Sequence, residues 1–287
     1  MPTAGNNTYR WLLRQGERLL RRRARPAPCE DAAFDAFLLL EKVTGISRTA
    51  YPLKKNDSPT AEERAEYLSL LRRRAAGEPV QYLLGEWEFM GLPLYVGPGV
   101  LIPRPETELL VEQSLELLRG RPNPRILELC GGSGCISIAL AKARPDAEIT
   151  CLELSAQALC YLRRNIARHG VPNLTAVEGD ALSPPPEIVD RYDAILSNPP
   201  YIAAGQLPAL QREVRQEPAM ALDGGPAIEK LTPHILRHTF CSNLVRQGMD
   251  VKSVQYLMGH ASAGVTLDVY SHINYTDIKE KMLDIAS

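Results

Sequence analysis

The chain has 287 residues, of which 45% are apolar and 23% charged, and its formal net charge is −1. This balance is typical of a globular protein with room for two or three domains. The near-neutral charge argues against a protein built mainly to coat nucleic acid. No stretch approaches the roughly 20 apolar residues of a membrane span, and no signal peptide is evident. We therefore expect a cytoplasmic protein without a membrane partner.

The six cysteines are scattered along the chain, and no two of them form a Cys-x-x-Cys pair. Four lie inside apolar runs, where a thiol usually serves as a small buried hydrophobic group. We therefore expect neither a disulfide framework nor a metal site.

Residues 1–78 are expected to form a helical substrate-recognition domain. Apolar side chains recur at helical spacing between Trp11 and Leu20 and again between Ala33 and Leu40. Thr60 stands before the acidic pair Glu62-Glu63, a pattern typical of a helix start.

The pattern changes in residues 79–226, where strands and helices are expected to follow one another. Apolar and polar residues alternate from Val80 to Phe89 and from Leu92 to Val96, which predicts a β-hairpin around Met90-Gly91. Two prolines, Pro103 and Pro105, then hold an extended backbone before the next helix.

From residue 124 onward, short apolar runs alternate with amphipathic ones. The predicted order is strand Ile126–Cys130, helix Ile136–Ala143, strand Glu148–Leu154, helix Ala156–His169, strand Leu174–Val177 and strand Asp193–Ser197. Such alternation predicts a parallel, doubly wound, Rossmann-like sheet and thus an α/β fold.

A glycine-rich turn follows the first strand of this sheet, between Glu128 and Gly134. Glycines let the backbone turn tightly and approach a ligand without a Cβ in the way. Glu153 ends the second strand, where a carboxylate can accept hydrogen bonds from both ribose hydroxyls. Asp180-Ala181 follows the third strand, in a position to contact an adenine. Three strand ends are therefore expected to meet at one adenosine.

The negative charge at the turn after the first strand indicates which cofactor the site binds. A carboxylate at Glu128 disfavours the phosphates of a dinucleotide but suits a cationic amino-acid group, through water or backbone amides. The expected cofactor is S-adenosyl-L-methionine, bound by Glu128, Cys130, Gly131, Gly132, Ser133, Gly134, Glu153, Asp180, Ala181 and Asn198.

The fourth strand leads into Asn198-Pro199-Pro200-Tyr201, the predicted catalytic residues. An amide nitrogen is a poor nucleophile because its lone pair is delocalised. The Asn198 side-chain oxygen and the Pro199 carbonyl can accept both N–H hydrogens and orient the lone pair, while the prolines fix that carbonyl. Tyr201 offers a ring against which a planar group can stack. These residues indicate an amino-group methyltransferase, with an adenine flipped out of DNA as an alternative acceptor.

Over residues 8–225 the chain resembles the bacterial peptide chain release factor N5-glutamine methyltransferases. The motifs that carry the resemblance are Leu101 to Glu108, Leu129 to Cys135, Asn198 to Ile202, Glu213 to Pro218 and Ala221 to Gly225. The resemblance implies methylation of the glutamine in the Gly-Gly-Gln loop of class I release factors. The family pattern has glycine at Cys130, threonine at Gly131, and aspartate at both Glu128 and Glu153.

The composition changes near Pro226. Residues 1–228 hold 23 Arg, 4 Lys and 22 Pro, whereas residues 229–287 hold 2 Arg, 4 Lys and 1 Pro, which suggests two segments of different origin. From Leu231 the chain resembles the C-terminal end of tyrosine recombinases of the phage integrase type. The resemblance implies Tyr270 as nucleophile, with the scissile phosphate held by His234, Arg237 and His260.

Residues 227–287 are expected to form a helical tail that is catalytically incomplete, because recombinases use a further arginine and a lysine upstream. DNA strand transfer is one alternative function of the chain, and a non-functional fusion product is another. In either case the methyltransferase sheet is expected to be truncated, with its fourth strand as an open apolar edge. We expect such a sheet to bind its cofactor weakly.

Overall fold

The computed structural model describes residues 7–23, 31–188 and 191–224. Within these ranges the contacts define two compact units. The described residues of the smaller one are 201–205 and 223–224, in which Ile202 and Asp223 form a parallel bridge and the Gly224 N–H donates to the Ile202 carbonyl at 2.9 Å. The described strands and α-helices all belong to the larger unit.

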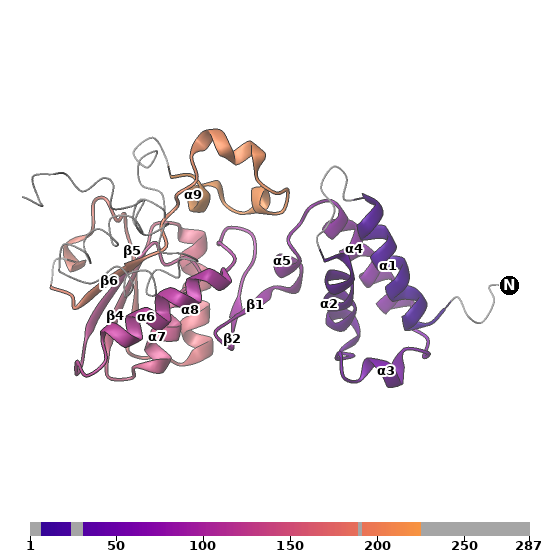
Figure 1. Ribbon diagram of the computed structural model, residues 1–287, viewed down its shortest axis with the longest axis horizontal. Helices are drawn as coiled ribbons and strands as arrows, with labels where there is room; N and C mark the ends of the chain where they lie inside the picture. The colour runs from indigo at the N-terminus through magenta and orange to yellow at the C-terminus, as the bar shows by residue number, and fades with distance from the viewer. Residues whose placement is uncertain (1–6, 24–30, 189–190, 225–287) are drawn as a thin grey trace, which may run out of the picture. The chain divides into compact units, whose positions relative to one another are not determined.

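The N-terminal part of the larger unit is helical (Figure 1). Its helices are α1 Tyr9–Arg23, α2 Ala32–Thr44, α3 Tyr51–Lys54, α4 Ala61–Ala75 and α5 Val80–Leu84. Leucines of α1, α2 and α4 share one buried core with Tyr67, whose hydroxyl donates to the Ala36 carbonyl at 3.0 Å. Thr60 begins α4 through a capping box with Glu63. The predicted N-terminal helical region is therefore confirmed.

A hairpin of two short strands follows, β1 Glu86–Phe89 and β2 Leu92–Tyr95, paired antiparallel. The connecting residues Met90 and Gly91 have φ of 50° and 73°. Two consecutive positive φ values are the backbone of a type I′ turn, the connection that suits the twist of paired strands. The hairpin is confirmed around the predicted turn.

Val80–Leu84 is the helix α5, so the strand predicted there is wrong. Pro79 precedes its first turn, and Gly85, with φ of 80°, ends it with a left-handed cap. Over five residues the apolar positions satisfy the spacing of a helical turn as well as that of a strand, and the two flanking residues decide between them.

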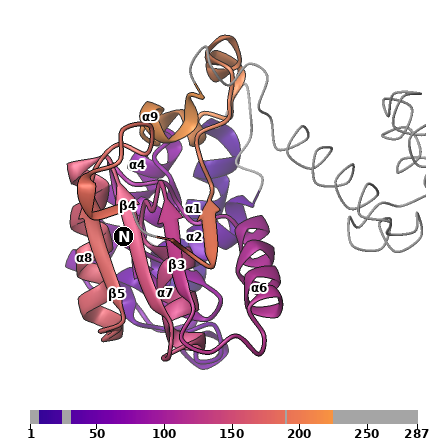
Figure 2. The same cartoon turned by 90° about the vertical axis from the view of Figure 1, so that its left-hand side faces the viewer.

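Four parallel strands form the main sheet (Figure 2). In spatial order they are β5 Leu174–Glu178, β4 Glu148–Glu153, β3 Arg125–Leu129 and β6 Ala194–Ser197. The chain runs from β3 outward to β4 and β5, and then returns to the other side of β3 as β6. In such sheets ligands bind beyond the carboxyl ends of the strands where the order reverses, which here is between β3 and β6. The predicted α/β class with a Rossmann-like parallel sheet is confirmed.

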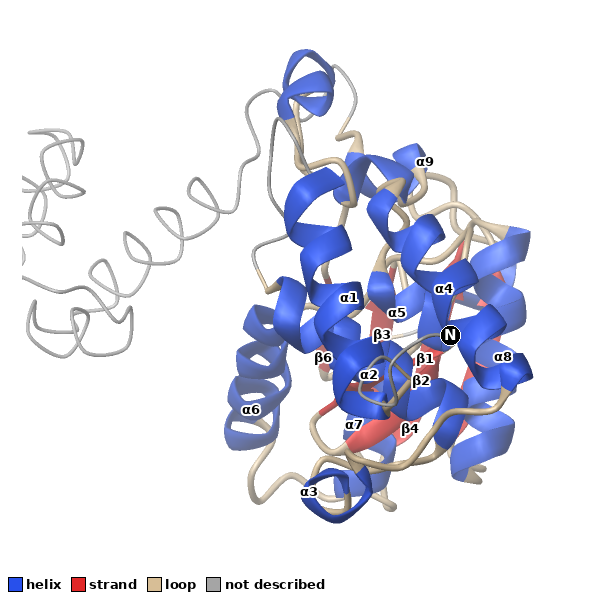
Figure 3. Cartoon of the chain, turned by 90° about the vertical axis from the view of Figure 1, so that its right-hand side faces the viewer, coloured by secondary structure: helices blue, strands red, loops and turns tan. Residues whose placement is uncertain are grey.

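One face of this sheet, the helix-covered face, packs against three helices (Figures 2 and 3). They are α6 Glu108–Leu117, α7 Cys135–Ala143 and α8 Ala156–His169. Strand side chains on this face, such as Ile126, Ile149 and Cys151, are at most 1% exposed. The main core of the larger unit therefore lies between the sheet and these helices.

The opposite face, the open face, is built differently. Among the described residues, its buried cluster joins Leu127 and Leu152 to Ile188 and Tyr192, which lie on connecting segments rather than on α-helices. Ile195 of β6 is 61% exposed. Within the described part of the chain, β6 pairs with β3 alone.

Short elements complete the described chain. They are the 3-10 turns η2 Pro105–Thr107, η3 Pro186–Ile188, η4 Ala204–Ala209 and η5 Val214–Gln216, and the helix α9 Ala219–Leu222. No described helix has both the length and the apolar character needed to cross a membrane. The recombinase-like residues His234, Arg237, His260 and Tyr270 lie outside the described residues.

Candidate active site

The glycine-rich turn joins β3 to α7 at the carboxyl edge of the sheet. Cys130 and Gly132 have positive φ, 59° and 56°, and for the cysteine this conformation costs about 1 kcal/mol. A Cβ on Gly131 would lie 2.1 Å from the Cys151 sulfur, so with Cys151 in this position glycine is the residue that fits without displacing that thiol. A Cβ on Gly132 would meet nothing within 4 Å. The backbone of the turn can therefore be approached closely on the side of Gly132.

Asn165 of α8 holds this turn from the helix-covered face. Its buried side-chain amide donates to the Ser133 carbonyl at 2.9 Å, and it also exchanges hydrogen bonds with the Tyr95 backbone at 2.7 and 3.1 Å. A Cβ on Gly134 would lie 2.3 Å from Leu162, also on α8. Asn165 was not among the predicted site residues, although a lone amide on the apolar side of a predicted helix indicates a buried side chain with specific hydrogen-bond partners.

Glu153, at the end of β4, links two turns. One carboxylate oxygen accepts from the Gly132 N–H at 2.6 Å and the other from the Ser155 N–H at 2.7 Å. Because each carboxylate oxygen can accept more than one hydrogen bond, both keep capacity for a further donor. The structure thus brings Glu153 to the glycine-rich turn, and its contact with a ribose remains a prediction.

Glu128 faces the core instead of the sheet edge, with an exposed fraction of 1%. Its carboxylate accepts from the Ser137 N–H at 2.9 Å, from the Ser137 hydroxyl and from the Cys151 thiol at 3.4 Å. Burial raises the pKa of Glu128 to about 7. The carboxyl is thus only partly ionised near neutral pH. Glu128 was predicted to act on the cofactor through water or backbone amides. Its hydrogen bond to the Ser137 N–H, in the first turn of α7, is compatible with such an indirect role.

Asp180 and Ala181 follow β5 and lie in a turn tied to the Glu153 strand. The Gly179 N–H donates to the Glu153 carbonyl at 3.0 Å, and the Asp180 carboxylate accepts from the Leu182 N–H at 2.9 Å. The third strand end is thereby joined to the second. The adenine contact of Asp180 and Ala181 remains a prediction.

The predicted catalytic segment follows β6, next to the turn of β3. The Ser197 hydroxyl donates to the Leu129 carbonyl at 3.0 Å, and the Asn198 side-chain nitrogen donates to the Thr107 hydroxyl at 3.4 Å. Asn198, Pro199 and Pro200 are all half-buried. The donor end of the Asn198 amide is thus engaged by the protein, while the predicted chemistry uses its acceptor end.

Tyr201 belongs to the smaller unit, in which its side chain is 44% exposed. An exposed ring is compatible with the predicted stacking of a planar group. That role stays a prediction.

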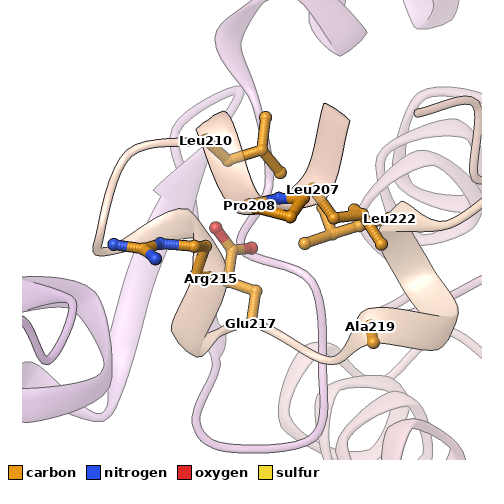
Figure 4. Close-up of a pocket in the computed structure, with 7 residues that line it drawn as sticks. All are labelled: Leu207, Pro208, Leu210, Arg215, Glu217, Ala219 and Leu222. Atoms are coloured by element: carbon orange, nitrogen blue, oxygen red, sulfur yellow. The ribbon is translucent and has the colours of Figure 1, made fainter. Parts of the chain in front are cut away.

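A pocket of about 260 Å³ lies in the segment from Gln206 to Leu222 (Figure 4). It is lined by Leu207, Pro208, Leu210, Arg215, Glu217, Ala219 and Leu222. Glu217 is 5% exposed and accepts from the Ile102 N–H at 3.0 Å and from the Arg104 guanidinium at 2.5 Å. Apart from Arg215 and the already paired carboxylate of Glu217, the pocket wall is therefore apolar.

A second ion pair fixes the same segment. Buried Arg74 of α4 donates to Asp35 of α2 at 2.6 Å and to Glu213 at 2.8 Å. Glu213 and Glu217 thereby anchor the segment after the predicted catalytic residues to two other parts of the larger unit. The sequence predicted that these two acids belong to a family motif, but it did not predict their ion pairs.

Known families match the same regions. The model of the PrmC N-terminal domain matches residues 12–85, and that of the methyltransferase small domain matches residues 105–226. The release factor glutamine methyltransferase of Geobacter sulfurreducens is 42% identical over 197 residues, which cover 68% of each chain. That of Bordetella pertussis is 43% identical over 201 residues, covering 69% of this chain and 74% of the relative. The chain belongs to the release factor glutamine methyltransferase family.

A further relative, the release factor glutamine methyltransferase of Chlorobaculum tepidum, is 37% identical over 253 residues, covering 82% of this chain and 85% of the relative. Among solved structures, a precorrin-6y C5,15-methyltransferase from Geobacter metallireducens is 23% identical with a TM-score of 0.30. The match covers 41% of this chain and 60% of that one.

The phage integrase family model matches residues 210–277. This range overlaps the methyltransferase match, and among the described residues the overlap includes Glu213 and Glu217. Both side chains make the ion pairs of the larger unit described above. The described part of the overlap is thus built into the methyltransferase region.

Proposed function

We propose that the chain uses S-adenosylmethionine to methylate the side-chain amide of a glutamine in class I peptide chain release factors. The supporting observation is the position of Asn198, at the end of β6 and beside the glycine-rich turn of β3. It lies where the strand order reverses, the usual ligand site of this fold. Family membership supports the choice of acceptor. Because release factors act in translation, we propose a cytoplasmic location.

The residues at the three strand ends fit S-adenosylmethionine. Gly132 leaves open space for a ligand, and Glu153 keeps acceptor capacity for ribose hydroxyls. The charged side chains that follow these strand ends are Glu153 and Asp180, with the partly ionised Glu128 buried behind the glycine-rich turn, so the described turns hold carboxylates and no cation. Such a set repels a pyrophosphate and tolerates a cationic ligand. We assign cofactor contacts to Cys130–Gly134, Glu153 and Asp180-Ala181, with Glu128 acting through the turn.

When bound, this cofactor supplies an electrophilic methyl group. The side chain of Asn198 and the carbonyl of Pro199 would accept the two N–H hydrogens of the glutamine amide and orient its nitrogen. A nitrogen–carbon bond forms, the carbon–sulfur bond breaks, and one amide proton leaves to solvent. The prolines restrict the backbone, so the carbonyl is fixed before the substrate arrives. Tyr201 would stack on the planar amide.

The test combines the purified chain, S-adenosylmethionine with a labelled methyl group and a class I release factor. We expect label on the glutamine of the Gly-Gly-Gln loop, and none on a release factor with that glutamine changed to alanine. Asn198→Ala should lower kcat by about 100-fold or more, the usual effect of removing one oriented hydrogen-bonding group. Transfer to adenine in DNA, or no transfer to the release factor, would contradict the proposal.

DNA strand transfer is a second candidate, favoured by the integrase match over residues 210–277. In that case Tyr270 would attack a phosphate held by His234, Arg237 and His260. A covalent adduct with nicked DNA that is lost in Tyr270→Phe would support it. No adduct would leave the segment without catalytic function, as the sequence analysis expects.

A further inference from the structure

The side chain of Asn198 has two ends that differ in hydrogen bonding. The amide nitrogen only donates and the oxygen only accepts. The predicted role of Asn198 uses the oxygen, because the glutamine amide presents N–H groups. A rotation of the Asn198 amide by half a turn would bring its NH₂ group against the NH₂ group of the substrate. The orientation of this amide therefore decides whether the site can bind its acceptor productively.

Thr107 holds the nitrogen end of that amide. Its hydroxyl oxygen lies 3.4 Å from the Asn198 side-chain nitrogen, although the two residues are 91 positions apart. Thr107 ends the 3-10 turn η2 and stands immediately before α6, whereas Asn198 follows β6. The contact thus joins the motif Leu101 to Glu108 to the motif that begins at Asn198.

Neighbouring bonds keep Thr107 in place. Its own N–H donates to the Arg104 carbonyl at 3.0 Å, and the Arg104 side chain is paired with buried Glu217. On its other side, Glu108 accepts from the Met90 N–H of the hairpin turn at 2.8 Å. The hydroxyl is therefore presented from a backbone segment that is fixed at both ends.

We propose that Thr107 is a positioning residue that holds the Asn198 side chain through its amide nitrogen, which leaves the amide oxygen to face the substrate nitrogen. The inference rests on the proposed function. It assigns Thr107 a part in catalysis without contact to the cofactor or the acceptor.

The first test compares Thr107→Val and Thr107→Ser in methyl transfer to a release factor. Valine keeps the shape but removes the hydroxyl, and serine restores it. We expect Thr107→Val to lower kcat about ten-fold, with KM for the release factor nearly unchanged, and Thr107→Ser to recover most of the loss. Thr175→Val, at an exposed threonine of β5, is the matched control and should leave kcat unchanged.

A second readout does not depend on turnover. In protein labelled with ¹⁵N in its asparagine side chains, the Asn198 NH₂ signal is the one that disappears in Asn198→Asp. Loss of the hydrogen bond should shift one of its two protons upfield in Thr107→Val but not in Thr107→Ser. An unchanged signal in Thr107→Val, or equal kcat in the wild type and Thr107→Val, would overturn the proposal. Failure of the wild type to methylate a release factor would instead contradict the proposed function, while the NMR signal still decides the role of Thr107.

Discussion

The two faces of the sheet are covered to very different degrees. On the helix-covered face Ile149 is 1% exposed and Cys151 is fully buried, whereas on the open face Ile195 is 61% exposed. The glycine-rich turn between β3 and α7 is held from the helix-covered face, through hydrogen bonds of Glu128 and Asn165. This difference indicates that the covered face supplies most of the burial around the sheet, together with the support of the glycine-rich turn. Substitutions at exposed positions of the open face, such as Ile195, should therefore disturb neither.

The largest test of this comparison is a pair of matched truncations. Ile149→Ala should lower the free energy of unfolding by about 4 kcal/mol, because it leaves a cavity in a closely packed core. Ile195→Ala should cost less than about 1 kcal/mol, since most of its side chain already meets solvent. Urea titrations of both variants give the two values. Similar losses would show that the open face is covered in solution.

The next effect depends on pH. The pKa of Glu128 is about 7 in the folded protein, against an ordinary value of 4.5. The folded state therefore binds this proton more tightly than the unfolded state does. Stability from this group is fully present below about pH 4.5 and falls as the pH rises to about 7, by up to about 3 kcal/mol.

Glu128→Gln should remove that slope, because a glutamine does not titrate. The variant should gain stability relative to the wild type between pH 5 and pH 8, as measured by urea unfolding at both values. If the two proteins keep a constant difference over this range, Glu128 does not have the raised pKa.

A smaller effect is expected in the glycine-rich turn itself. Cys130 adopts a φ of 59°, a conformation in which glycine is free of strain. Cys130→Gly should therefore stabilise the protein by about 1 kcal/mol. Cys160→Gly, in the exposed part of α8, is the control and should lower stability slightly. A loss of stability in Cys130→Gly would mean that the thiol packing outweighs the backbone strain.

The smallest effect is expected at Leu182, which is 92% exposed in the turn after β5. Leu182→Ser should change the free energy of unfolding by less than about 0.5 kcal/mol. Thermal unfolding monitored by circular dichroism measures this. A loss above about 2 kcal/mol would show that the side chain is buried in solution.

Much of the sheet could be predicted because local signals bound its elements. Helix α8 was predicted to the residue, since Ser155 caps its start and left-handed Gly170 ends it. Local signals failed at Val80–Leu84, where five residues suit either a helical turn or a strand. Periodicity placed Glu128 on a strand, but what covers that strand is a matter of packing, so its burial could not be foreseen.

Of the candidate site, the positions of the residues at strand ends could be predicted from the sequence, whereas those of their supporting residues could not. Asn198 and Glu153 end their strands, and the parallel order brings strand ends together, so spacing in the sequence was enough. Thr107 and Asn165 act through partners that are 91 and 32 positions away. Such contacts depend on how hairpin, helix and sheet pack, which no local pattern encodes.

The most direct test of the account is the thermal unfolding of the chain with and without S-adenosylmethionine. A ligand at about 100 times its Kd stabilises the folded state by about 2.7 kcal/mol, because it binds that state alone. For a protein of this size we predict a rise in Tm of roughly 5–10 °C. An unchanged Tm at saturating S-adenosylmethionine would contradict the claim that these strand ends form a cofactor site.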